Sequence, residues 1–451
     1  MQQTVQTLHE MVWGPWTMAL FLGTGMFFTL RSCGFQIRKF PYWWMQTIGS
    51  LGRKREENDG GKISAFASSC TALAATIGTG NIVGVATALT AGGPGAVFWL
   101  WISALIGMAT AYAETSLGQK YRYRNADGTW QCGPMIYMEQ GVGCQSMALL
   151  YALFAVFASL GMGSMVQANA VSETLCYEAG MSPKVAAVLI TALTAAVVWG
   201  GIRRISKMTS WFVPLSAGIY VFFSVWVLIC CRKYIPTVLV QIGKEAWTAQ
   251  AAGGGITGFL FSRSVRFGLA RGVFSNEAGL GTLAVLHGAT EDTTPQEQGM
   301  WAMFEVFFDT IVICTLTALV ILCVRQECES SLFADLDGAS LTSFCFSQVL
   351  GQIGGVLVSG SMAAFAFATI IGWYYIGRQT LGYLGKRLQV GRLFETFYPV
   401  VYLGSVYLGC ISKLDFIWLA SDLVNGLMAY PNLLALWMLA KQVHFPGSPS
   451  V

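Results

Sequence analysis

Hydrophobic positions in this chain fall into long, nearly unbroken runs, and short polar segments separate them. A helix needs about 20 mainly apolar residues to cross about 30 Å of hydrocarbon, and stretches of that kind recur from one end of the sequence to the other. The pattern predicts an all-α polytopic membrane protein. We expect eleven membrane-spanning helices, over residues 12–30, 64–90, 96–118, 146–175, 184–200, 209–231, 255–289, 299–323, 352–377, 394–411 and 415–440.

Two of these runs are interrupted by glycine. A glycine inside a helix costs about 1 kcal/mol relative to alanine, so a cluster of them favours unwinding. Unwound backbone at membrane depth is tolerated where it lines a polar cavity, and two such breaks are typical of the binding site of a secondary transporter. Tight helix crossing is the alternative explanation. The glycines are Gly78, Gly80 and Gly84 in the second run and Gly272, Gly279 and Gly281 in the seventh.

The order of the runs predicts an internal repeat. With the first run set aside, the remaining ten divide into two groups of five, and each group begins with its broken segment. A five-helix unit repeated once must appear in opposite orientations, which is the layout of an inverted-repeat transporter. We therefore expect an N-terminal extra helix with a basic loop over 1–62, a first five-helix repeat over 63–232 and a second over 253–441.

Composition agrees with the membrane assignment. Of the 451 residues, 54% are hydrophobic and 11% are charged, and the mean hydropathy is +0.56, whereas soluble domains carry about 25% charged residues. No basic region precedes the first run, so a removable signal peptide is not expected. The twelve cysteines lack metal-ligand spacing, although Cys323, Cys328 and Cys345 flank one loop and a pairing among them stays open.

Basic residues alternate between the predicted loops and indicate an orientation. One side of the membrane carries Arg31, Arg38, Lys39, Arg53, Lys54, Arg55, Lys62, Lys120, Arg122, Arg124, Arg203, Arg204, Lys207, Arg378, Lys386, Arg387, Arg392 and Lys441, and the other carries Lys184, Arg232, Lys233, Lys244, Arg325 and Lys413. Because cytoplasmic loops are enriched in Lys and Arg, we expect the N-terminus outside and the C-terminus in the cytoplasm.

A broken helix offers two kinds of binding group. Free N–H groups at the start of one half suit a carboxylate, and free carbonyls at the end of the other half suit a small cation. Gly78-Thr79-Gly80 has no bulky side chain beside its backbone. A small zwitterion therefore fits such a pair of ends.

At these residues the chain resembles the bacterial and archaeal alanine/glycine:cation symporters, which are also called sodium:alanine symporters. The resemblance rests on FASSCTAL (66–73), GTGNIVGVATA (78–88), GGPGA (92–96), GPM (133–135), RFG (266–268), ARGVFSNEAGLG (270–281), DFIW (415–418) and NGLMA (425–429). It covers about residues 10 to 440. It implies a leucine-transporter-like fold, alternating access and sodium- or proton-driven uptake of a small neutral amino acid in a prokaryotic plasma membrane.

The resemblance also implies the residues of the site. The substrate is expected at Ile77, Gly78, Thr79, Gly80, Gln167, Phe274, Ser275, Asn276, Thr369 and Trp373, and the cation at Ala74, Ile77, Thr369 and Asn81. Two positions depart from the family's pattern. Ala368 stands where a second threonine is common, and Tyr374 stands where a serine is usual. A missing oxygen ligand weakens a hard-cation site, so a proton-coupled amino-acid or glutamine symporter is the alternative.

Several charged residues lie in or near apolar runs, where charge is costly and by default indicates function. They are Glu114, Glu173, Glu277, Glu305, Asp309, Asp415 and Asp422. Glu277 adjoins the second break and is the first candidate for cation, proton or gating chemistry. For Glu114 we expect snorkelling to the membrane interface or pairing with Lys120 or Arg122. Arg263, Arg266 and Arg271 either gate the outer vestibule by pairing with acids or form structural ion pairs, and we expect the structural pairs. The lone span histidine, His287, is expected to be a hydrogen-bonded structural group.

Other classes of function find less support. A passive channel usually shows a repeated filter motif, and none is present. An enzyme needs an acid/base or metal motif such as HExxH or GxSxG, and direct ATP drive needs a P-loop; the sequence contains none of these. Nor do the basic residues form a stripe for nucleic acid. We expect no cofactor, with a sodium ion or proton as coupling ion. The preferred amino acid, stoichiometry and oligomeric state stay open.

Overall fold

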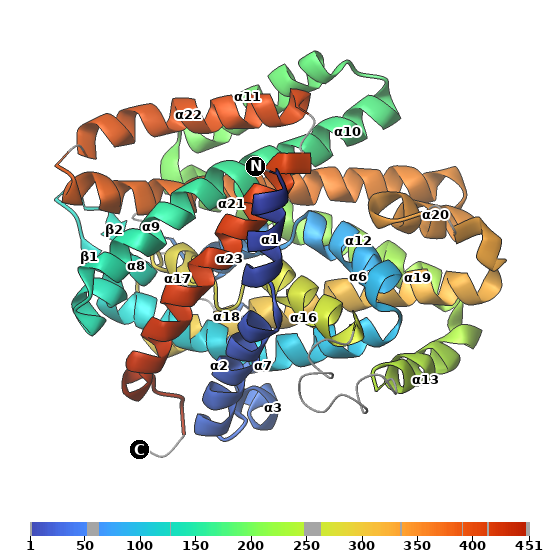
Figure 1. Cartoon of the computed structure of the whole chain (residues 1–451), viewed down its shortest axis with the longest axis horizontal. Helices are drawn as coiled ribbons and strands as arrows, with labels where there is room; N and C mark the ends of the chain where they lie inside the picture. The colour runs from blue at the N-terminus through green and yellow to red at the C-terminus, as the bar shows by residue number, and fades with distance from the viewer. Residues whose placement is uncertain are drawn as a thin grey trace.

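The computed structural model describes residues 2–51, 63–126, 128–247, 263–333, 336–389, 391–412 and 415–447. They form a helical bundle with one short hairpin, in which β1 (Tyr123–Arg124) pairs antiparallel with β2 (Trp130–Gln131) (Figure 1). The α-helices are α1 (Gln2–Val12), α2 (Pro15–Arg31), α3 (Phe35–Arg38), α4 (Phe40–Gln46), α5 (Ala65–Thr76), α6 (Val83–Gly92), α7 (Gly95–Tyr121), α8 (Pro134–Tyr137), α9 (Gln145–Leu160), α10 (Gln167–Ala179), α11 (Pro183–Val198), α12 (Gly201–Cys230), α13 (Ile235–Glu245), α16 (Arg263–Asn276), α17 (Thr282–His287), α18 (Pro295–Val306), α19 (Thr315–Glu327), α20 (Gly338–Leu350), α21 (Gln352–Arg387), α22 (Gly391–Ile411) and α23 (Asp415–Met438).

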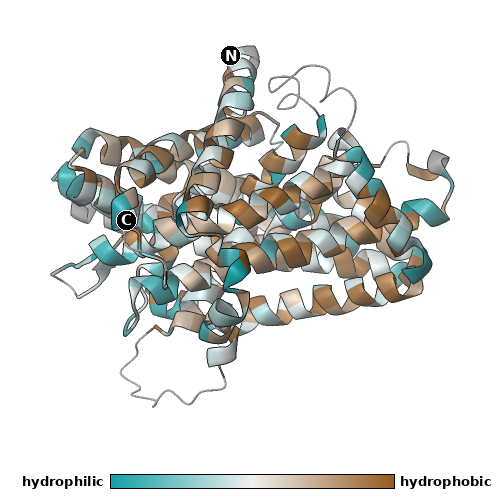
Figure 2. Ribbon diagram, turned by 90° about the horizontal axis from the view of Figure 1, so that it is seen from below, coloured by the Kyte–Doolittle hydropathy of each residue, from teal (hydrophilic) through white to brown (hydrophobic). Residues whose placement is uncertain are grey.

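Helices occupy all eleven ranges that the hydrophobic runs predict. By length and apolarity, six helices of the described chain are able to cross a membrane, or seven when one strongly bent pair is counted as a span. The helices α11 and the described part of α22 are apolar but shorter. The structure is therefore a multi-pass helical membrane protein, while the number eleven remains a prediction. Figure 2 shows hydrophobic residues along the helices and hydrophilic ones gathered toward the ends of the bundle.

Both predicted breaks are present. The helix axis turns by 64° between α5 and the segment Thr79–Gly92, which begins with the short 3-10 helix η2 (Thr79–Asn81). The second break separates α16 from α17, and its backbone is left-handed at Glu277 (φ 55°), Gly279 (φ 95°) and Gly281 (φ 85°). Residues 255–262, at the start of the seventh run, lie outside the described residues, as do the proposed domain limits at 62 and 253.

Three helical runs contain π-helical turns. These are η3 (Met138–Val142), η4 (Gly161–Val166) between α9 and α10, and η6 (Phe307–Cys314) between α18 and α19. A π-helical turn widens the helix locally and is frequent at functional sites. The turn η6 lies beside the first break, because it contacts η2, and η4 contacts α21, which also contacts η2.

The long helix α7 connects the parts of the bundle that carry the breaks. It packs against α16, α17 and α18 of the second half and against α2 near the N-terminus. On the other side, α5 packs against α12 and α21. Both broken helices are thus enclosed by long helices, and their break points are buried.

Several helices lie outside the eleven predicted spans, and α13 and α20 are two of them. Both α13 and α20 lie in segments that the hydrophobic pattern assigns to loops, and Figure 1 places them at one end of the long axis, away from β1 and β2. Neither is long enough to span. The suggested pairing among Cys323, Cys328 and Cys345 is wrong, because all three are free thiols.

Candidate functional site

At the first break the chain leaves the helix with its backbone amides redirected. The N–H of Ile77 still donates to the Leu73 carbonyl at 2.8 Å. The next amide, of Gly78, instead donates to Asn81 Oδ1 at 3.0 Å, so the Ala74 carbonyl loses the partner that a continuous helix would supply. The amides of Thr79 and Gly80 have no acceptor within the described chain. The break therefore exposes a pair of N–H groups and free carbonyls.

Two buried oxygen atoms at the break also lack a partner among the described residues. They are Oγ1 of Thr79 and Oε1 of Gln167, whose side chains are 2% and 1% exposed. The amide nitrogen of Gln167 donates to the Met162 carbonyl at 3.4 Å, so its oxygen faces the break. Buried polar atoms are nearly always satisfied by a partner. These atoms therefore mark a place where a polar ligand fits.

Gly78 and Gly80 bring the predicted substrate residues together. A methyl group added at Gly78 would lie 2.8 Å from Thr369 Oγ1 and 3.5 Å from Gln167 Oε1. One added at Gly80 would lie 3.3 Å from the Phe274 ring and 3.6 Å from Ser275 Cα. Absence of a side chain at these two glycines thus allows α10, α16 and α21 to approach the unwound backbone.

A cavity of about 200 Å³ leads to this backbone. Its walls include Thr79, Gly80 and Phe274 from the predicted site, together with Arg271 and Trp418. Phe274 and Trp418 also form a small apolar cluster with Met162 and Val166, apart from the main core. The cavity is smaller than the roughly 300–1,000 Å³ of sites for drug-sized ligands. It therefore suits a small molecule with an apolar part.

Asp309, in η6, links the two breaks. Its carboxylate is 0% exposed and accepts hydrogen bonds from Asn81 Nδ2 at 2.7 Å, Ser275 Oγ at 2.7 Å and Thr310 Oγ1 at 2.9 Å. No Lys, Arg or His of the described chain forms an ion pair with it. A buried charge is costly unless it is paired. This Asp309 cluster, of Asn81, Ser275, Asp309 and Thr310, is therefore suited to a cation.

The predicted cation residues thus divide between two places. Thr369 Oγ1 donates to the carbonyls of Ile77 at 3.3 Å and of Phe365 at 3.0 Å, so Thr369 and Ile77 meet as predicted. Asn81 lies in the Asp309 cluster instead, because both ends of its amide are engaged there and at Gly78. Among the described residues no group of three His, Cys, Asp or Glu side chains forms a metal-binding cluster.

Around the second break, a different carboxylate holds the backbone. Glu114 Oε2 accepts from the amides of Gly279 at 3.2 Å and Gly281 at 3.1 Å and from Asn432 Nδ2 at 3.0 Å. The expectation that Glu114 pairs with Lys120 or Arg122 is wrong, because it sits on the inward face of α7. Lys120 and Arg122 donate to other groups.

Trp373 and Glu277 connect the second break to α21. The Trp373 indole N–H donates to Glu277 Oε1 at 3.1 Å, and Glu277 is one of four non-glycine residues of the described chain with positive φ. The ring lies against Gly163 of η4, where an added methyl group would overlap it. Trp373 thus packs between η4 and the second break. Asn276, by contrast, donates to Thr310 Oγ1 at 3.2 Å and accepts from the Ala278 amide.

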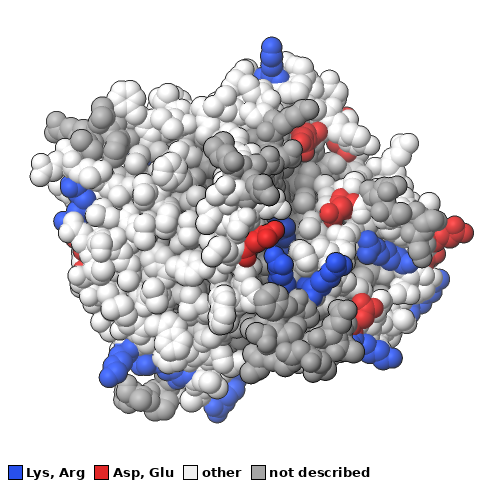
Figure 3. Space-filling model, in the orientation of Figure 1, with Lys and Arg blue, Asp and Glu red and all other residues white. Residues whose placement is uncertain are grey.

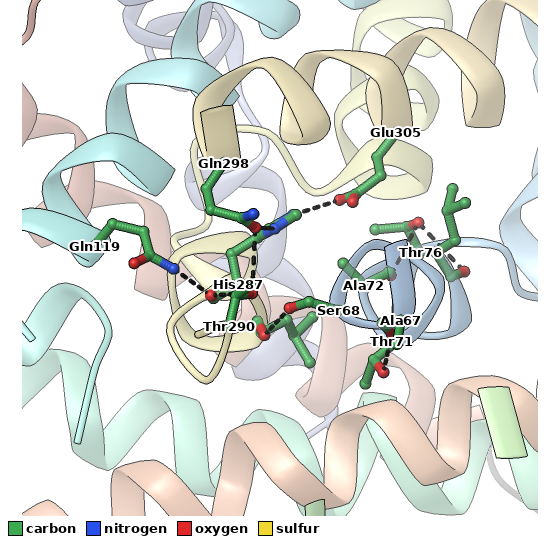
Figure 4. A network of polar contacts seen from close by, with 12 residues as sticks. Ala67, Ser68, Thr71, Ala72, Thr76, Gln119, His287, Thr290, Gln298 and Glu305 are labelled. Carbon is green, nitrogen blue, oxygen red and sulfur yellow. Dashed lines mark hydrogen bonds and ion pairs between the residues drawn. The ribbon is translucent and has the colours of Figure 1, made fainter. Parts of the chain in front are cut away.

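A buried polar network lies between α5, α17 and α18 (Figure 4). His287 Nδ1 contacts Gln298 Oε1 at 2.7 Å and Nε2 contacts Glu305 Oε2 at 2.9 Å, with His287 0% and Glu305 1% exposed. Gln298 Nε2 donates to Thr293, so its oxygen faces the ring and Nδ1 carries a hydrogen. One further proton therefore lies between Nε2 and Glu305. His287 is a hydrogen-bonded group, as expected.

The two departures from the family's pattern have different surroundings. Ala368 is buried beside Thr369, so no hydroxyl is available at its position. Tyr374 stacks on Tyr398, with ring centroids 5.5 Å apart, and meets the edge of Tyr402 at 5.2 Å. Its ring therefore packs toward α22, on the side of α21 away from the first break.

A model of the Sodium:alanine symporter family matches residues 1–445. The chain belongs to the sodium:alanine symporter family. It is 40% identical to an uncharacterized transporter of Haemophilus influenzae, over 98% of this chain and 94% of that protein. It is 37% identical to the sodium/alanine symporter AgcS of Methanococcus maripaludis, over 97% and 94%. The probable sodium/glutamine symporter GlnT of Bacillus subtilis is 32% identical, over 98% and 89%.

Solved structures agree on the fold. A Na⁺-coupled sialic acid symporter superposes with a TM-score of 0.56 at 15% identity, over 95% of this chain and 87% of the other. A manganese transporter of Eremococcus coleocola superposes with a TM-score of 0.53 at 14% identity, over 89% and 84%. These structures show a transporter fold. Because the chain belongs to the sodium:alanine symporter family, it is a cation-coupled amino-acid transporter of a membrane, not an enzyme.

Sequence reasoning about this symporter-family chain missed the roles of Asp309 and Glu114. Both were recognised as acids within apolar runs, which by default indicate function, but their partners lie 228 and 165 to 318 residues away in sequence. No local pattern reveals such contacts. The π-helical turn around Asp309 is likewise invisible in the hydrophobic pattern.

Proposed function

We propose that this protein uses an inward sodium gradient to drive uptake of a small neutral amino acid, such as alanine or glycine, by alternating access. The names of its relatives support sodium as the coupling ion and a neutral amino acid as the substrate. The observation that carries the proposal is Asp309, a buried carboxylate without a basic partner that both broken helices reach through Asn81 and Ser275. A sodium ion bound there would neutralise its charge.

The amino acid binds at the first break. Its carboxylate receives the N–H groups of Thr79 and Gly80, at the start of η2, where the helix end also favours negative charge. The unpartnered oxygens of Thr79 and Gln167 accept from its ammonium group. Phe274 and the apolar cluster around it enclose a short side chain. A cavity of about 200 Å³ supports a substrate of this size.

Coupling follows because sodium and the amino acid bind next to the same broken helices. Sodium at the Asp309 cluster draws Asn81 of η2 and Ser275 of α16 to one charge, which fixes both breaks in the geometry that binds the amino acid. The carbonyls of Ala74 and Ile77, with the Thr369 hydroxyl, form a second oxygen-lined position for the same ion or another. Hard cations prefer such oxygen ligands.

For the architecture we propose eleven spans in the plasma membrane, with two inverted five-helix repeats after an extra N-terminal helix. The N-terminus is outside and the C-terminus is cytoplasmic. One cavity supports a route of access to the first break, because the cavity of about 200 Å³ reaches Gly80. Another cavity, of about 450 Å³, is lined by Trp130, Tyr374, Tyr375 and Arg378.

Uptake by purified protein in liposomes tests the proposal. Labelled alanine, glycine and glutamine are supplied under an inward sodium gradient, an inward proton gradient, or neither. We expect accumulation above equilibrium with the sodium gradient alone. Accumulation with the proton gradient alone would mean that a proton, not sodium, is the coupling ion. Equilibration without either gradient would contradict coupled transport.

Gly80→Leu is expected to abolish amino-acid binding while the protein still folds. A side chain at this position meets the Phe274 ring, since even a methyl group would lie 3.3 Å from it, and it fills the approach to the free amides. Equilibrium binding of labelled alanine to the purified variant measures the effect. The matched control is Gly360→Leu, because nothing lies within 4 Å of a methyl group at Gly360. Retained binding by Gly80→Leu would place the site elsewhere.

A further inference from the structure

Arg271 stands at the entrance to the proposed site. It lies on α16, one turn before Ser275, and its side chain is half-buried. Its guanidinium carbon lies 5.6 Å from the centroid of the Phe274 ring, a distance at which cation and ring attract each other. Arg271 lines the cavity that reaches Thr79 and Gly80. The ring contact holds the guanidinium group at the wall of that cavity.

No acid of the described residues forms an ion pair with Arg271. The ion pairs that we expected for Arg263, Arg266 and Arg271 are absent from the described part of the chain, where basic groups elsewhere do pair, as Arg124 does with Glu291 at 3.0 Å. Basic side chains lie beside acidic ones at a hollow over α16 on the face shown in Figure 3. Arg271 thus presents to a cavity a guanidinium group that has no ion-pair partner among the described residues.

Asp422 lines a neighbouring cavity but forms no ion pair with Arg271. A second cavity, of about 80 Å³, is lined by Arg271, Phe274 and Arg266 of α16 and by Asp422 of α23. Asp422 Oδ2 contacts His9 Nε2 at 2.8 Å, and its other oxygen is buried without a hydrogen-bond partner. Arg271 and Asp422 therefore line one small cavity and do not form an ion pair with each other.

We propose that Arg271 and Asp422 form an entry site for the zwitterionic substrate, outside the position at Thr79 and Gly80. The guanidinium fork of Arg271 binds the carboxylate, because its geometry matches carboxylate oxygens, and the free Asp422 oxygen accepts from the ammonium group. Arg271 and Phe274 line both cavities, so the carboxylate is passed from the guanidinium group to the amides of Thr79 and Gly80. This inference rests on the proposed amino-acid transport.

The entry site predicts a selective loss of apparent affinity. In Arg271→Gln we expect the alanine concentration for half-maximal sodium-driven uptake to rise at least about tenfold, the effect of losing a charge-assisted hydrogen bond, with little change in the maximal rate. Asp422→Asn should raise it in the same direction. Arg271→Lys, which keeps the charge and loses the fork, should fall between wild type and Arg271→Gln.

The experiment measures initial uptake of labelled alanine by proteoliposomes across a range of concentrations, with and without external propionate, which has a carboxylate and no ammonium group. Propionate should inhibit the wild type competitively and Arg271→Gln at least about tenfold more weakly, because the guanidinium group of Arg271 binds its carboxylate where the two cavities meet. The matched control is Arg263→Gln, since Arg263 is exposed on the same helix and lines neither cavity.

Each outcome distinguishes the inference from the proposed function. Wild-type kinetics and wild-type propionate inhibition in Arg271→Gln would overturn the entry site while leaving amino-acid transport intact. An equal effect of Arg263→Gln would also overturn it, because the loss would then reflect general surface charge. If the wild type transports no amino acid, the proposed function fails and the entry site fails with it. Melting temperatures of the variants, expected to equal that of the wild type, separate loss of binding from loss of fold.

Discussion

Asp309→Asn is expected to lower the sodium affinity of transport by at least about a hundredfold. A unit charge about 4 Å from a cation is worth about 4 kcal/mol at an effective dielectric constant of 20, and about 1.4 kcal/mol corresponds to a tenfold change in affinity. Asparagine keeps the size of the side chain, and the hydroxyls of Ser275 and Thr310 are able to accept from its amide nitrogen. The fold should therefore survive while the charge is lost.

The measurement is the sodium dependence of alanine uptake, with sodium-dependent alanine binding as a second readout that needs no gradient. Asp337→Asn is the matched control, because Asp337 is an exposed residue that caps α20 and lies outside the Asp309 cluster. An unchanged sodium dependence in Asp309→Asn would remove Asp309 from the coupling site and leave the position at Ile77 and Thr369 as the only one proposed.

The elements of the fold were largely predictable because a membrane imposes strong local rules. Runs of about 20 apolar residues have to be helices in hydrocarbon, and glycine clusters weaken a helix wherever they occur. For that reason the eleven ranges and both breaks appear in the sequence itself. The helices α13 and α20 escaped notice because they are short, with 11 and 13 residues, and do not obey the rule for spans.

The candidate site was predictable only in part, for a physical reason. Unwound backbone is a local property, and so Thr79 and Gly80 were found. The partner of an intramembrane acid is a property of packing. Glu114 was assigned to nearby cations by its place in the sequence, yet it points inward from α7 and binds the second break. The same limit applies to Asn81, whose side chain meets Asp309 across 228 residues.

His287→Leu is expected to lower the free energy of unfolding by about 3–5 kcal/mol, the usual cost of removing one partner from a buried ion pair. The carboxylate of Glu305 would then face apolar surroundings without the imidazole that contacts it at 2.9 Å. Glu305→Leu should cost less, about 1–3 kcal/mol, because it leaves a neutral imidazole nitrogen without a partner. Denaturant titration of the purified variants, followed by circular dichroism, measures both values.

The double variant His287→Leu/Glu305→Leu decides whether the pair acts as a unit. It removes both members together, so no charged group is left unpaired. Gln298 Oε1 loses the imidazole but keeps the Thr290 hydroxyl as a donor at 3.3 Å. We expect it to be more stable than His287→Leu alone, since replacing a whole buried pair by apolar side chains is often neutral. Strictly additive losses would contradict the pair and would mean that His287 and Glu305 stabilise α17 and α18 independently. The network lies against α5, the helix that ends at the first break. We therefore expect the single variants to lose transport in parallel with stability. The double variant should regain part of the lost transport.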